Sequence, residues 1–198
     1  MSIAMQECEQ IARSQGLAAG LARALSGAQV AATAPGRYAA VRAEDVPRGA
    51  AVRTHSLADA EDIVFLECPG ERPRSAPDLV EIGRLVAAVR LGVLRRMLDQ
   101  AVEHLSNREA GGEPLVRKQL VTGTIADVIA GVELLRIYAQ TQNEPAAIAD
   151  VHNQIDELGW EVAKLFGAAG YIADHAARSL YVSALVANTW IDREGAER

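Results

Sequence analysis

The chain has 198 residues, 49% of them hydrophobic, which suffices for one sizeable domain or two small ones. Its formal net charge of −6 would repel a phosphate backbone, which argues against nucleic acid as a partner. Cys8 and Cys68 show no paired or metal-ligand spacing, and the sequence has neither a signal peptide nor a long apolar run. We therefore expect a soluble protein of the reducing cytoplasm, with both cysteines as thiols, no metal and no membrane association.

Residues 1–33 are predicted to form an N-terminal helix. The segment from Ile3 to about Ala32 is rich in alanine and leucine and contains no proline. Its larger apolar residues recur near helical spacing at Ile11, Leu17, Leu21 and Leu25. This periodicity favours a helix despite Gly16 and Gly20.

Residues 34–76 are predicted to be a reduced segment of short strands and loops. Four prolines punctuate it, at positions 35, 47, 69 and 73. Between them lie YAAVRA, AAVRTHSL and DIVFLEC, short runs with the β-branched or aromatic content typical of strands.

Residues 77–198 are predicted to form a C-terminal helical bundle. A first helix runs from Pro77 to Asn107, and a second opens at Pro114 and reaches about Thr141. The rest, Ala146–Glu194, holds one long or two shorter helices, with glycines at 159, 167 and 170 as weak points. The expected fold is therefore mainly α, an antiparallel bundle preceded by a small β segment.

The first bundle helix carries more apolar residues than one buried face requires. Leu91, Leu94, Leu98 and Val102 widen its apolar stripe. We expect a second layer on this helix, supplied by self-association or by a partner.

An arginine lies on the turn between the two helices, in HLSNREAGGEPLVRKQ. Arg108 in the last turn of a helix can simply meet the negative end of the helix dipole. However, the spacing of Arg108, Gly111-Gly112, Pro114 and Gln119 resembles the RxxFGxPIxxxQ turn of the acyl-CoA dehydrogenase family, with Gly111 in place of the phenylalanine. Both interpretations of Arg108 stay open at this stage.

The resemblance extends along roughly half of the chain. RLVAAVRLGVLRRMLDQAVEHLSNR resembles the family helix that continues ALDxAxxYAxxR, and GTIADVIAGVELLR resembles its LADMxxxxxAxxLL helix. EVAKLFGAAGYIADHA is similar to MAKxFASExAxxVADxA, and DIVFLECPGERP resembles a degraded exit from the family's β-domain. Together these matches indicate a truncated, degenerate relative of acyl-CoA dehydrogenases.

In that family, the turn arginine of one subunit contacts the pyrophosphate of FAD held mainly by a neighbouring subunit. The resemblance therefore implies that Arg108, Gly111, Gly112 and Gln119 form a cofactor-binding turn for an FAD shared with a partner. A guanidinium suits this role because it presents a rigid fork of donors to anionic oxygens.

Two family landmarks are missing. The QxxGGxGY segment, which binds the adenosine half of FAD, is replaced by residues 178–183, RSLYVS. SALVANTWIDREGAER offers no counterpart to the segment with the catalytic glutamate, so catalytic residues are not assigned. The resemblance then implies a partner subunit that completes or stabilises a FAD-dependent acyl-thioester oxidoreductase, docked on a longer relative. The alternative is a stand-alone enzyme with repurposed chemistry, either a reduced flavin oxidoreductase or a cofactor-free lyase or cyclase.

Other candidate chemistry is weaker. His152 and Asp156 are an i, i+4 pair, for which a solvated surface pair is favoured over a metal site because no further ligands accompany it. Trp160, Phe166 and Tyr171 would form an aromatic wall for a ligand or, as the favoured interpretation, pack in a core or interface.

Overall fold

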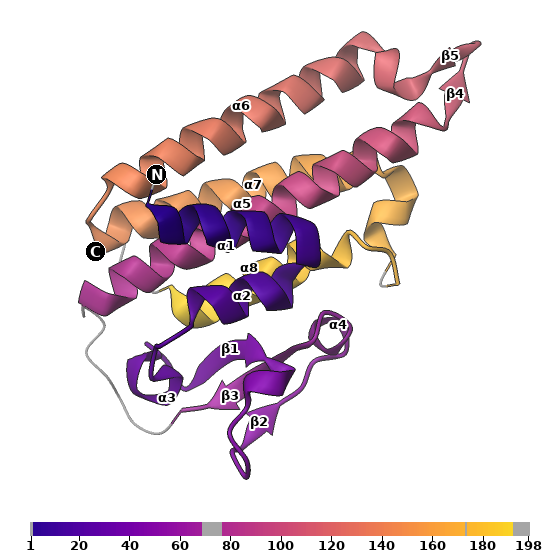
Figure 1. Cartoon of the computed structure of the whole chain (residues 1–198). Helices are drawn as coiled ribbons and strands as arrows, with labels where there is room; N and C mark the ends of the chain where they lie inside the picture. The colour runs from indigo at the N-terminus through magenta and orange to yellow at the C-terminus, as the bar shows by residue number, and fades with distance from the viewer. Residues whose placement is uncertain (1, 69–76, 173, 192–198) are drawn as a thin grey trace.

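The computed structural model describes residues 2–68, 77–172 and 174–191. Figure 1 shows a bundle of long helices with a small sheet packed along one side. The fold is mainly α with a small antiparallel sheet near the N-terminus, as the sequence predicts. None of the helices in the described ranges has the length and apolarity needed to cross a membrane. Positions 69–76 and 192–198, including most of CPGERP and of the polar tail with Glu194, lie outside the described residues.

The N-terminal segment contains three helices where the sequence predicted one. They are α1 (Ile3–Gln15), α2 (Leu17–Ala24) and α3 (Val30–Thr33). The break comes at Gly16, which has φ of 100°, a conformation that L side chains rarely adopt and that ends a helix. α2 therefore folds back, and both helices pack on the central helix of the bundle.

The sheet has the strand order β1-β3-β2, all antiparallel. Its strands are β1 (Tyr38–Arg42), β2 (Val52–Arg53) and β3 (Ile63–Glu67), with the short helix α4 (Ser56–Asp59) between the last two. These strands confirm the three short runs identified in the sequence.

The outer edge of β1 is closed by the last helix, α8 (Arg178–Trp190). The Ala40 amide donates to Thr189 Oγ1 at 3.0 Å, and Trp190 Nε1 donates to the Ala40 carbonyl at 3.0 Å. Both side chains thus satisfy backbone groups that an edge strand would otherwise leave open. The sheet is consequently fixed to the bundle.

The centre of the bundle is α5 (Pro77–Ser106), which packs against α1, α2, α6, α7 and α8. Leu91, Leu94 and Leu98 are buried and Val102 is half-buried. The second layer that the sequence demands is therefore built by the other helices of the same chain, α7 among them, and the expectation of a docking face on this helix was wrong. Gly92 makes the approach of α1 possible, since an added Cβ would lie 2.3 Å from the Glu9 carbonyl oxygen.

Two further helices complete the bundle, α6 (Gln119–Thr141) and α7 (Pro145–Leu165). α6 lies at the outer side of the bundle in Figure 1 and packs mainly on α7. Arg136 of α6 pairs with the buried carboxylate of Glu9 in α1, with Nε to Oε2 at 2.8 Å. After α7 the α-helical conformation ends, and Gly167 has φ of 60°. The chain then passes through a 3-10 turn, η3 (Gly167–Tyr171), before α8.

Candidate functional site

The predicted cofactor-binding turn is a β-hairpin that projects from one end of the bundle. Its strands are β4 (Glu109–Ala110) and β5 (Glu113–Pro114). Gly111 and Gly112 form the two-residue turn with φ of 66° and 76°, as a type I′ hairpin requires at both positions. Pro114 is therefore a strand residue, and the prediction that it opens a helix was wrong, because α6 begins five residues later at Gln119.

Arg108 lies at the base of this hairpin and is exposed. Its carbonyl accepts from the Leu115 amide at 2.7 Å, which closes the hairpin, and its Nη1 lies 3.2 Å from His104 Nε2. Gln119 is exposed at the first position of α6, at the same end of the bundle. The structure thus places the four predicted residues at one end of the bundle, with Gly111 and Gly112 in the hairpin turn, Arg108 at its base and Gln119 at the start of α6. Whether they hold FAD stays a prediction.

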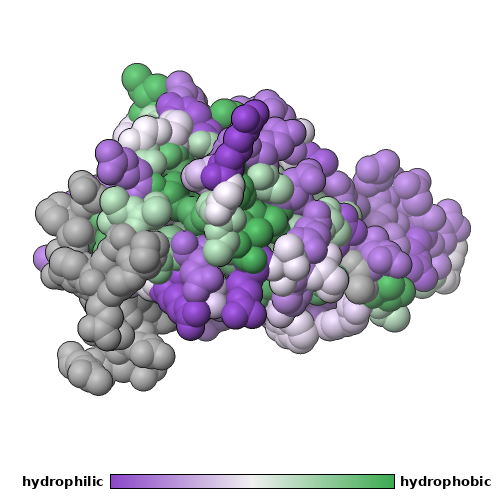
Figure 2. All heavy atoms as spheres, turned by 90° about the horizontal axis from the view of Figure 1, so that it is seen from below, coloured by the Kyte–Doolittle hydropathy of each residue, from purple (hydrophilic) through white to green (hydrophobic). Residues whose placement is uncertain are grey.

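Charges of both signs surround the hairpin: Glu109 is exposed, Glu113 pairs with Lys118 at 3.0 Å, and further positive features lie close by in the chain. No side chain caps the N-terminus of α6, which leaves its positive dipole end open to an anion. Arg117 is exposed in the preceding 3-10 turn, η2 (Leu115–Arg117). In Figure 2, which views the molecule from the side of the sheet, the β4–β5 end at the right is mostly hydrophilic.

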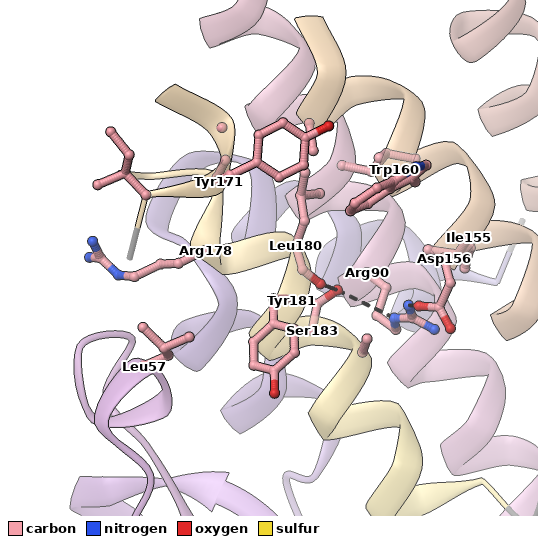
Figure 3. Close-up of a pocket in the computed structure, with 17 residues that line it drawn as sticks. Leu57, Arg90, Ile155, Asp156, Trp160, Tyr171, Arg178, Leu180, Tyr181 and Ser183 are labelled. Atoms are coloured by element: carbon pink, nitrogen blue, oxygen red, sulfur yellow. Dashed lines mark hydrogen bonds and ion pairs between the residues drawn. The ribbon is translucent and has the colours of Figure 1, made fainter. Parts of the chain in front are cut away.

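A second candidate site is a cavity of about 390 Å³ between the helices, shown in Figure 3. α5, α7 and α8 form most of its wall, and η3 and Leu57 of α4 complete it. The positions where the resemblance predicts the adenosine half-site supply part of this wall, through Arg178, Leu180, Tyr181 and Ser183. Residues 178–183, which lack the family's QxxGGxGY motif, thus help to line this cavity.

At the floor of this cavity lies a buried arginine. The Arg90 side chain is 1% exposed and forms an ion pair with Asp156, whose side chain is 30% exposed. Arg90 Nη1 also lies 2.9 Å from His152 Nδ1 and donates to the His152 carbonyl at 3.1 Å. His152 Nε2 lies 3.0 Å from the Gly83 carbonyl and therefore carries the proton, which leaves Nδ1 as an acceptor for Arg90.

The solvated interpretation of His152 and Asp156 was therefore wrong. His152 is fully buried, and its spacing to Asp156 serves to place both groups around Arg90. The described residues contain no group of three or more His, Cys, Asp or Glu side chains placed to hold a metal ion.

Arg90 was missed as a site residue, although the sequence contains a signal for it. It lies in LVAAVRLGVL, where apolar residues surround the arginine on every side of the helix. A charge inside a helix that is buried all round needs a partner, and the i, i+4 pair on α7 offers both a carboxylate and an imidazole. What the sequence could not give is the packing of α7 that brings them together.

The three aromatic residues singled out in the sequence divide between cavity and core. Trp160 and Tyr171 line the cavity and form an edge-to-face pair with ring centroids 5.5 Å apart. Phe166 is buried and packs edge-on against His175, with centroids 4.7 Å apart. The aromatic wall thus exists for two of the three, whereas Phe166 belongs to the core.

Comparisons with known proteins agree with this architecture. A family model described as acyl-CoA dehydrogenase, C-terminal domain, matches residues 76–191. The chain therefore belongs to the acyl-CoA dehydrogenase family, through its C-terminal helical domain. None of the curated protein sequences compared with this chain is significantly similar to it.

Solved structures show the same fold. A variant of the steroid acyl-CoA dehydrogenase Tcur3481–Tcur3483 matches with a TM-score of 0.57 at 19% identity, over 76% of this chain and 47% of that chain. Butyryl-CoA dehydrogenase from Megasphaera elsdenii gives 0.51 at 19%, over 69% and 41%. FkbI, of methoxymalonyl extender unit biosynthesis for Fk520, gives 0.57 at 21%, over 84% and 57%. The chain thus spans about half the length of the structures it matches.

Proposed function

We propose that this chain is a partner subunit that docks on a longer member of its family and contributes Arg108 to an FAD held mainly by that member. The observation that carries the proposal is the end of the bundle where Arg108 is exposed at the base of the hairpin and where the N-terminus of α6 has no side-chain cap. Two positive features at one end of the bundle favour an anionic ligand such as a pyrophosphate.

The outer side of α6 supplies a docking surface. Leu120, Ile129, Leu134 and Ile137 are exposed along this one helix, by 87%, 48%, 64% and 60%. Apolar groups gathered on one element mark an interface more often than scattered ones do. Because α6 continues directly from the hairpin, one partner could cover both.

The comparisons agree with a partner role. The name of one structural match, the steroid acyl-CoA dehydrogenase, joins two designations, Tcur3481 and Tcur3483. A FAD-dependent acyl-thioester oxidoreductase completed by a second subunit would make use of the retained turn.

Arg108→Ala tests this proposal. The chain is co-expressed with a longer family member from the same source, and FAD retention by the purified assembly is measured from its visible absorption. Losing a charge-assisted contact to phosphate should weaken FAD binding about ten- to a hundredfold, which corresponds to about 1.5–3 kcal/mol. Arg48→Ala, at an exposed arginine in the loop before β2, is the matched control and should leave FAD retention unchanged.

Docking is tested separately with Leu134→Glu, which should abolish co-purification of the two chains, whereas Ile3→Glu, at an exposed position of α1, should not. If no assembly that contains the wild-type chain holds flavin, Arg108 is only a helix-end charge. The repurposed, cofactor-free enzyme would then replace the partner subunit as the better hypothesis. The cavity does not favour that alternative now, because Arg90 and Asp156, which lie at its floor, are paired with each other.

A further inference from the structure

The cavity between α5, α7 and α8 gathers apolar surface that the partner role leaves unexplained. Trp160 and Tyr171 are each 57% exposed, Ile172 is 58% and Tyr181 is 50% exposed, and all four line this one hollow. Figure 3 shows Trp160 and Tyr171 on one side of it and Tyr181 and Leu57 on another. Such clustering is typical of ligand sites, and a volume of about 390 Å³ falls in the usual range of about 300–1,000 Å³.

The charged groups of the cavity balance one another. Arg90 pairs with Asp156 at the floor, and Arg178 at the rim pairs with Glu61, with Nε to Oε1 at 2.9 Å. Ser183 donates its hydroxyl to the Leu180 carbonyl at 3.0 Å, so its proton is already engaged. A ligand therefore meets two neutralised ion pairs and an apolar wall.

This balance selects against charged ligands. A carboxylate at the floor would face the Asp156 carboxylate, while an ammonium would have to compete with Arg90 for that carboxylate, and either would lose its hydration on entry. An uncharged molecule pays neither cost and gains the burial of its own apolar surface and that of the aromatic rim.

We propose that this cavity binds an uncharged, largely aliphatic small molecule of medium size. The proposal is independent of the partner role, since it needs neither FAD nor a second chain. It rests on the pairing of Arg90 with Asp156, the apolar wall and the exposed aromatic pair at the mouth.

The test uses three probes of equal chain length that differ in charge: 1-decanol, decanoate and decylammonium. Binding to the full chain is followed by calorimetry and by tryptophan fluorescence, where Trp160 at the mouth responds and buried Trp190 gives a constant background. We expect saturable binding of one decanol per chain, with a blue shift of emission, and at least roughly tenfold weaker binding of both charged probes. Equal or tighter binding of decanoate, or no saturable binding of decanol, would overturn the proposal.

Ala184→Leu fills the cavity from α8 and should abolish decanol binding, because Ala184 lines the wall and is half-buried. Ala146→Leu makes the same change at an exposed site in the first turn of α7 and should bind decanol as the wild type does. Unchanged binding by the Ala184 variant would place the decanol elsewhere and refute this site. Asp156→Asn removes one charge of the floor pair and should shift the ratio of decanoate to decanol affinity toward decanoate by about tenfold. If this variant does not fold, the comparison of the three probes on the wild type and the Ala184→Leu variant still test the proposal.

Discussion

Breaking the ion pair at the cavity floor should destabilise the fold in an asymmetric way. Asp156→Ala would leave the guanidinium of Arg90 buried at 1% exposure without its carboxylate. The cost of such an uncompensated charge is about 3–5 kcal/mol. Arg90→Met would instead leave Asp156, whose side chain is 30% exposed and can still reach water. The same variant removes the Arg90 donor from Nδ1 and the carbonyl oxygen of buried His152, and because these acceptors are neutral we expect this second loss to be smaller, at about 1–3 kcal/mol.

The double variant, with Asp156→Ala and Arg90→Met together, completes a double-mutant cycle. Once both charges are gone, no buried ion remains, so the double variant should be more stable than Asp156→Ala alone by about 2 kcal/mol or more. The free energy of unfolding is measured by urea denaturation followed by circular dichroism, at one pH and in the absence of ligand.

A surface pair on the same helix provides the control. Lys164 Nζ and Glu161 Oε1 are 2.6 Å apart with both side chains more than 40% exposed, so Glu161→Ala should change stability by less than about 1 kcal/mol. Equal costs for the two single variants, or simple additivity in the double variant, would refute the asymmetry argued from burial.

Two further predictions concern packing and pH. Gly92→Ala should lower the free energy of unfolding, measured in urea, by at least about 1–3 kcal/mol, because the added Cβ would lie 2.3 Å from the Glu9 carbonyl oxygen. Gly123→Ala on α6 has open space around it and should raise that free energy by about 0.5–1 kcal/mol. Equal effects of the two variants would contradict the close approach of α1 to α5. Burial raises the pKa of the Cys8 thiol from 9.0 to about 11, so the unfolded chain loses this proton first and stability should fall as the pH rises from about 9 to 11. Melts of Cys8→Ala over the same range should show a shallower decline, and an identical slope would refute the assignment to Cys8.

The long helices were predictable because their apolar residues repeat with the period of a helix over many turns. α5 begins at Pro77 and ends at Ser106, one residue before the predicted end, and the three strand runs became β1, β2 and β3. The split of the first helix was not predicted, because the sequence shows a glycine at position 16 but not its backbone angle. Gly20, four residues on, remains inside α2 as a helical residue.

The cavity could not be predicted from the sequence, for a different reason. Arg90 and Asp156 are 66 positions apart, and only the packing of α7 on α5 makes them partners. Each residue alone has a plain surface interpretation, since most charges on helices are solvated. The apolar neighbours of Arg90 are the local evidence against that interpretation, and they predict burial without naming the partner.

The conformation at Pro114 was predicted wrongly because a proline in this turn motif fits two local structures. Pro114 suits the first position of a helix, where no amide is needed, and equally the end of a short edge strand, for the same reason. The two glycines decide between them, because positive φ at both turn positions makes a tight hairpin and pairs Glu109 with Pro114. The hairpin therefore carries Gly111 and Gly112 away from the bundle, while Arg108 is exposed at its base.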